Sequence, residues 1–248
     1  METHAHHLHN PPGKKFWHYF FEFFMLFLAV TLGFFVENQR EHYVDGKKEK
    51  QFVKSFGRDL QKDIYELDGL IRQREQRKLW LDSLTFMLQS PDPDVYGRDI
   101  YFYSRYLPRV YVYISNDATV QQLKNAGNFR LINEQAVADT IMAYDQQIAF
   151  IQRIRDREEK VCERIYNSLN TLFDNRVFDQ MTVYDIEFIR PPGNPHLKNK
   201  DKPELDKFLG NIHLLKTLNA AHIGWFKKQK KKAETTLAFI QKEFHIEK

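Results

Sequence analysis

The residues most able to carry chemistry are polar side chains that interrupt the apolar seams of predicted helices. Two interruptions lie on the second and third long helices, and a third is expected at the same height on the first. They are Arg155, Glu158, Asn219, His222, Tyr65 and Asp68. The alignment assumes that consecutive helices form antiparallel hairpins, symmetric about their loops. Such a set could be a polar layer that fixes helix register, or it could line a small-ligand pocket.

Motifs of familiar catalytic and cofactor sites are missing from the sequence. It contains no GxGxxG, no phosphate-binding loop, no HExxH and no GxSxG. The single cysteine, Cys162, excludes an internal disulfide and a Cys-rich metal site, and its seam position is typical of a buried, inert thiol. We therefore expect no catalytic residue, no metal site, no cofactor and no enzymatic activity.

An apolar run near the amino terminus, residues 16–36, predicts a transmembrane anchor, since a bilayer core needs roughly 20 apolar residues in a helix. Lys14 and Lys15 precede it, and Trp17 lies where interfacial aromatic residues are usual. A cleaved signal peptide is the competing interpretation, but the run is long for one, and Thr31 and Gly33 give only a poor cleavage site.

Glu22 lies about two turns inside this run, where a charge is costly unless it is shielded. It is either a protonated or snorkelling carboxyl near the interface, or a polar contact between neighbouring anchors in an oligomer. Residues 1–15 read as a flexible polar tail. The histidines of this tail could bind a transition metal, although solvated histidines are commoner; they are His4, His6, His7 and His9.

Three apolar patterns with helical spacing predict long helices over residues 47–88, 134–173 and 203–244. Only Asp45-Gly46 interrupts the path from the anchor into the first of them. The sequence therefore predicts an all-α fold, in which a transmembrane helix continues into an antiparallel bundle of about three long helices. The predicted soluble domain covers residues 37–248 and includes a short helical or irregular distal segment.

The distal segment, residues 96–114, holds six of the twelve tyrosines. Exposed tyrosines would suit a contact surface for a partner, although such residues can also cover the open end of a bundle. The candidates are Tyr101, Tyr103, Tyr106, Tyr111 and Tyr113. Antiparallel geometry also predicts that the loop at 174–203 returns toward the anchor. The net charge of +4 is too balanced to indicate nucleic acid, so none is expected as a partner.

The chain resembles an uncharacterised family of single-pass membrane proteins common in Bacteroidota, on three stretches that cover about a third of its length. Its segment TVQQLKNAGNFRLI at 119–132 is similar to the family's "LKxxGNLxLI" segment, although the tryptophan usual after such anchors is replaced near Arg40. The other matching residues are Glu22, Gly33, Asn38 and Glu41, Lys50 to Phe52, Asp59, Leu60, Asp63, and Tyr144. The resemblance implies an anchored helical domain and supplies no activity.

These observations predict an interaction or scaffold protein of the bacterial inner (cytoplasmic) membrane, bound to the lipid bilayer through residues 16–36. Basic residues beyond the anchor favour a cytoplasmic domain, but a short basic head before a first anchor commonly exports the rest, and we predict a periplasmic domain. The expected partner is a second copy, giving a homo-oligomer, or another membrane protein. The alternative function is a ligand-sensing bundle that works with a partner membrane protein.

Overall fold

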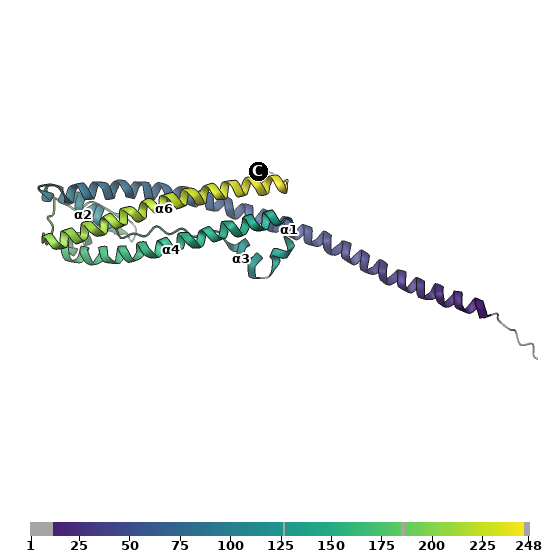
Figure 1. Cartoon of the computed structure of the whole chain (residues 1–248). Helices are drawn as coiled ribbons and strands as arrows, with labels where there is room; N and C mark the ends of the chain where they lie inside the picture. Colours follow the sequence, from purple (N-terminus) through teal and green to yellow (C-terminus); the bar gives the residue numbers. More distant parts are fainter. Residues whose placement is uncertain (1–11, 126, 185–186, 246–248) are drawn as a thin grey trace, which may run out of the picture. The chain divides into compact units, whose positions relative to one another are not determined.

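The computed structural model describes residues 12–125, 127–184 and 187–245 (Figure 1). The histidine-containing stretch 1–11 lies outside the described residues, so the predicted tail is described only from Pro12, where it is helical. The chain divides into two compact units, residues 1–51 and 52–248. The predicted domain boundary was 15 residues earlier, at the end of the apolar run.

Helix α1, Pro12–Leu88, passes through Asp45-Gly46 without a break. Proline suits its first position because the missing N–H would have no partner there. The most apolar window of 18 residues in α1 has a mean hydropathy of 2.1, and none of that window is buried. By length and composition, this part of α1 is able to cross a membrane.

The described residues of the second unit are all-α apart from one small hairpin. Its long helices are the remainder of α1, α4 (Gln135–Leu172) and α6 (Lys202–Glu243), and the bounds of α4 and α6 lie within one residue of the predicted ones. The predicted loop at 174–203 contains a short helix and the hairpin. The smaller elements are η1 (Pro93–Tyr96), α2 (Gly97–Tyr106), α3 (Ala118–Asn125), η2 (Asn128–Leu131), α5 (Asn175–Met181), β1 (Thr182–Tyr184) and β2 (Glu187–Phe188).

The direction of the helices differs from the predicted antiparallel bundle. α1 and α4 run in the same direction, and α6 runs opposite to both (Figure 1). Early residues of α1 and α4 meet where the Phe56 ring packs against Tyr144, and later residues meet where Arg74 binds Glu158. Antiparallel hairpins are therefore wrong for the first pair of helices and right only for the α4–α6 pair.

The reason is the long connection between α1 and α4. α2 packs at the Leu88 end of α1, and residues 107–117, here called the strap, then run back along α1 to the start of α3. Leu107 is held at Arg77, Tyr111 at Arg74, and Asn116 at Asp63. An extended strap can span up to about 36 Å, which exceeds the roughly 21 Å from Arg77 to Asp63 along the helix.

The apolar core consists of two clusters. One gathers at the Leu88 end and contains Tyr101, Phe173 and Phe208, whereas the other lies toward Phe52 and contains Tyr144 and Phe226. Phe178, Met181 and Phe188 are buried residues of the 174–201 connection, and the first two belong to the Leu88-end cluster. The prediction that this connection returns toward the other end is wrong, because α4 runs parallel to α1.

Candidate functional site

A buried ionic layer lies between the two apolar clusters. Its members come from all three long helices, and none is more than 1 % exposed to solvent. They are Arg74 and Arg77 on α1, Glu158 on α4, and Asn219 and His222 on α6. Because these positions continue the apolar stripe of each helix, the same periodicity that builds the core brings the polar side chains together.

Glu158 is the centre of the layer. Arg74 donates from Nη1 to Oε1 and from Nη2 to Oε2, both at 2.8 Å, which is the bidentate geometry that best matches a carboxylate. Arg77 also donates to Oε1, and His222 Nε2 lies 3.0 Å from Oε2. Both carboxylate oxygens therefore have two polar neighbours.

The two arginines also hold backbone. Arg74 donates from Nη2 to the Tyr111 carbonyl at 2.9 Å, and Arg77 donates to the Leu107 carbonyl. Asn219 Nδ2 donates to the Arg74 carbonyl at 2.9 Å, which ties α6 to the main chain of α1. The Tyr111 ring covers both guanidinium groups, with its centroid 5.6 Å from Cζ of Arg74 and 5.5 Å from Cζ of Arg77.

The electrostatics of the layer favour a charged carboxylate and a neutral imidazole. Burial raises the pKa of Glu158, but hydrogen bonds from His222 and Arg74 and the charges of both arginines outweigh it, so the pKa lies below its usual range. Burial lowers the pKa of His222, the arginine charges lower it further, and Glu158 offsets only part of this. Two guanidinium cations and one carboxylate leave the layer with one net positive charge.

This arrangement is poorly suited to acid–base or nucleophilic chemistry. A carboxylate engaged by two guanidinium groups is a weak base, and a fully buried one is out of reach of substrate. Cys162 is 3 % exposed, and burial raises the pKa of its thiol, so little thiolate forms at neutral pH. The ion pairs and hydrogen bonds of the layer are therefore structural contacts, which join three helices and the strap.

A second polar cluster fastens the other half of the strap. Asp63 accepts hydrogen bonds from the backbone N–H and the side-chain amide of Asn116, at 2.8 and 2.9 Å, and from the Tyr144 hydroxyl at 2.5 Å. Asp59 accepts from the Thr119 hydroxyl at 2.6 Å. Burial and the neighbouring Asp63 raise the pKa of Tyr144, which keeps its hydroxyl a donor. Polar side chains of α1 thus replace the backbone partners that the strap would have in a sheet.

The structure brings together only part of the predicted set. Glu158, Asn219 and His222 meet as predicted. Arg155 is partly exposed and pairs with Glu159 on its own helix at 3.2 Å, because it lies on the flank of α4 and not on its buried face. It is not a member of the layer.

The predicted contribution of α1 is also wrong. Tyr65 is 79 % exposed, and Asp68 is partly exposed and pairs with Lys230 at 2.7 Å. Both were placed by an antiparallel α1–α4 hairpin that does not exist. The residue of α1 that lies level with Glu158 is Arg74, roughly 14 Å beyond Tyr65 along the helix.

Arg74 and Arg77 were not predicted as members of the layer, although the sequence contains a pattern that points to them. The apolar stripe of α1 breaks between Ile71 and Leu81, and Arg74 and Arg77 occupy the positions where the three-and-four spacing requires buried residues. An arginine at such a position is a candidate for a buried ion pair, because an unpaired buried charge is too costly.

The tyrosines of the distal segment do not form an exposed contact surface. Tyr101 and Tyr113 are buried, and Tyr103, Tyr106 and Tyr111 are partly buried. Each has a partner within the unit. Tyr101 Oη accepts a hydrogen bond from the Asp174 N–H at 3.0 Å, and Tyr113 Oη lies 3.3 Å from Tyr144 Oη. Their amphipathic rings fasten α2 and the strap to the bundle.

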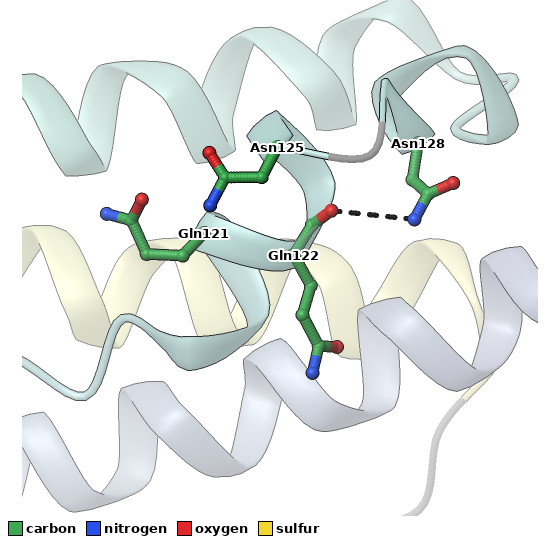
Figure 2. A pocket seen from close by; sticks show the side chains of 4 residues that line it. All are labelled: Gln121, Gln122, Asn125 and Asn128. Carbon is green, nitrogen blue, oxygen red and sulfur yellow. Dashed lines mark hydrogen bonds between the residues drawn. The ribbon is translucent and has the colours of Figure 1, made fainter.

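The described residues of the second unit form open hollows on its surface, and three of them lie beside α1 or α3. Figure 2 shows one of about 390 Å³ at α3 and η2, surrounded by the amide side chains of Gln121, Gln122, Asn125 and Asn128. The others, of about 490 and 560 Å³, lie beside α1 at Gly69 and at Leu79. None of these three is lined by a residue of the ionic layer.

The segment that carries the family resemblance has a structural explanation. Leu123, Leu131 and Ile132 are buried, and Gly127 adopts the left-handed conformation with φ of +62° between α3 and η2. Asn128 Nδ2 donates to the Gln122 carbonyl at 3.4 Å (Figure 2). Each of these residues therefore shapes the turn that leads the chain from the strap into α4.

Two further predicted features belong to the rest of the chain. Glu22 is exposed on α1 and has no hydrogen bond or ion pair to any residue that the structure describes. Within residues 12–125, 127–184 and 187–245, no group of three or more His, Cys, Asp or Glu side chains could hold a metal ion. The amino-terminal histidines lie outside these ranges.

Comparison with known proteins gives no assignment, since no protein-family model, no curated protein and no solved structure matches this chain.

Proposed function

We propose that this chain is a single-pass membrane protein whose helical unit acts as a scaffold for protein contacts on the periplasmic side of a bacterial inner membrane. The observation that carries the scaffold proposal is the closed ionic layer. Its five side chains contact one another and the strap with at most 1 % exposure, and none of them lines one of the hollows described above.

The membrane proposal is supported by the exposed apolar part of α1. Large apolar side chains along residues 16–36, except that of Leu28, are 42 to 75 % exposed, and such a continuous apolar surface is stable only when lipid or another protein covers it. The ligand-sensing alternative would require a cavity at the ionic layer, and the hollows described above lie elsewhere. It is the weaker of the two functions.

We further propose that the chain belongs with the Bacteroidota membrane proteins that it resembles. Four matching residues share one task, because Asp59, Asp63, Thr119 and Tyr144 hold the strap and the start of α3 in place. A structure of a family member in which the "LKxxGN" segment does not form a helix followed by a left-handed glycine would contradict this proposal.

Fractionation of cells expressing the full chain tests the anchor. We expect the protein to stay in the membrane pellet after alkaline carbonate and to require detergent for release. The double substitution Leu28→Asp with Leu32→Asp should move most of it to the supernatant, because each aspartate at the centre of a span costs about 3 kcal/mol. The matched control is Leu79→Asp with Leu214→Asp, two exposed leucines of the second unit, which should not change the fraction. Wild-type protein released without detergent would overturn the proposal.

Two further experiments test the side of the membrane on which the helical unit lies and its role as a scaffold. Protease added to intact spheroplasts should digest the helical unit if it is periplasmic, whereas digestion only after lysis would place it in the cytoplasm. In-cell crosslinking followed by identification of the captured proteins should give a reproducible partner protein. Stoichiometric copurification of a small molecule instead would favour the sensor.

A further inference from the structure

The apolar part of α1 has two chemically different faces. At about 100° per residue, all eight phenylalanines of residues 16–36 fall within an arc of about 160°. They are Phe16, Phe20, Phe21, Phe23, Phe24, Phe27, Phe34 and Phe35. His18, Glu22, Ala29 and Gly33 lie within an arc of about 60° on the opposite side. One face is therefore suited to lipid, and the other carries both ionisable side chains of the run.

The ionisable side chains of the polar face are not paired with any residue that the structure describes. Glu22 makes no hydrogen bond or ion pair with any described residue, and the same holds for His18 apart from a ring contact with Tyr19. A carboxyl group directed at lipid tails is strongly unfavourable, so polar residues inside spans normally face another helix. The segregation of the phenylalanines gives such a helix an open side of α1 on which to pack.

We propose that a second copy of this chain packs on this face, with His18 of each copy donating a hydrogen bond to Glu22 of the other. The proposal rests on the membrane anchoring proposed above. Copies inserted in the same orientation pair in parallel, and a two-fold axis between them makes the two contacts equivalent.

Charge complementarity selects a second copy over an unrelated helix. His18 and Glu22 are one helical turn apart on one face, about 6 Å along the axis, so in a parallel pair each His18 can reach diagonally across the interface to Glu22 of the other copy. The pairing satisfies both ionisable side chains at once. Ala29 and Gly33 have small side chains at the interface, which allows the two backbones to approach closely.

Cysteine crosslinking of the full chain in native membranes tests the interface. In a Cys162→Ser background, oxidation should link Leu26→Cys and Ala29→Cys into dimers, because Ala29 lies on the polar face and Leu26 borders it. Phe27→Cys and Thr31→Cys lie at similar depths on the opposite face and should remain monomeric. A dimer band from the phenylalanine face, or bands of equal strength at all four positions, would overturn the proposal.

A second set of variants tests the His18–Glu22 contact. In the Ala29→Cys background, Glu22→Ala should reduce the crosslinked fraction at least several-fold, whereas Phe23→Ala at the same depth should leave it unchanged. Exchange of the pair, His18→Glu together with Glu22→His, should restore the dimer, while either single exchange should not. Unchanged crosslinking in Glu22→Ala would overturn the assigned contact.

The two proposals fail in different ways. If the protein resists carbonate extraction but gives no dimer, or gives a crosslink to a protein of another mass, the pairing is wrong and the anchor stands. If carbonate releases the protein, the anchor itself is wrong, whatever the crosslinks show.

Discussion

At residue 158 the interior of the bundle holds a carboxylate between two guanidinium groups, with an imidazole beside it. In a low-dielectric interior each of these charges would be costly alone, and together they are tolerated because both carboxylate oxygens and all four Nη atoms of the arginines have a polar partner. Asn219 and the carbonyls of Leu107 and Tyr111 in the strap are further partners of Arg74 and Arg77. Removal of one member should therefore lower the free energy of unfolding, because it leaves the others buried without a partner.

Glu158→Gln should destabilise the protein by about 3–5 kcal/mol, because it leaves two buried guanidinium groups without a counter-charge. The measurement is urea unfolding of the detergent-solubilised full chain, followed by far-UV circular dichroism. Glu159→Gln is the matched control, since Glu159 is a partly exposed neighbour, and it should change the free energy of unfolding by less than about 1 kcal/mol. Equal effects of the two substitutions would contradict a buried network.

Acid should weaken the fold in two steps. The pKa of His222 is lower in the folded protein than its ordinary value of 6.5, so below about pH 6.5 the unfolded chain binds the extra proton and stability falls. The pKa of Glu158 is also lowered, so its contribution is complete above its ordinary value of 4.5 and is lost as the pH falls below it.

The first step is the one that His222→Gln should remove. The slope contributed by one proton is at most about 1.4 kcal/mol per pH unit between pH 6.5 and 5. His213→Gln, at an exposed position on the same helix, should leave the wild-type slope intact. An identical pH dependence in wild type and His222→Gln would show that the imidazole is not held neutral.

Among the elements, the strap is the one that depends most on side chains. It has β-like composition but pairs with no strand, and it is held by charged and polar residues of α1 through Leu107, Tyr111, Asn116 and the following Thr119. The strap leads into α3, which ends at the turn at Gly127. A single substitution can test this turn, because one backbone angle, φ of Gly127, controls it.

Gly127→Ala should destabilise the protein by about 1 kcal/mol, because φ of +62° is unfavourable for a residue with a Cβ atom. Gly224→Ala is the matched control with the opposite sign. Gly224 lies inside α6, and an added Cβ would meet no atom within 4 Å, so alanine should stabilise by about 0.5–1 kcal/mol. Thermal unfolding of both variants measures the difference, and a stabilising Gly127→Ala would contradict the turn.

The sequence predicted the elements better than their arrangement. Periodicity located α4 and α6 to within one residue, and it placed Glu158, Asn219 and His222 in one layer because a hairpin connects those helices. It could not place α1, since the direction of α4 depends on tertiary contacts of the strap that local patterns do not encode. Arg74 and Arg77 were within reach, because the break in the stripe of α1 is visible in the sequence.

For the whole molecule, the parallel course of α1 and α4 is the feature that most separates the structure from the simple bundle. Distances between spin labels can test it in a Cys162→Ser background. A label at Gln89, just after α1, should lie close to a label at Asn170. Its distance to a label at Gln135 should be about 50 Å, because α4 extends that far from Asn170 to Gln135. An antiparallel α1–α4 pair would reverse the order of the two distances.

The chain begins and ends its path through the second unit at the same end. An added Cβ at Gly57 would lie 3.5 Å from the side chains of Leu237 and Ile240, so the start of this unit and the end of α6 are neighbours. A force that pulls on these two points would unzip α6 from α1 turn by turn, and would not shear the helices along their whole length. The helical unit is therefore mechanically soft when pulled from its two ends, and the ionic layer is an obstacle midway along the unzipping path.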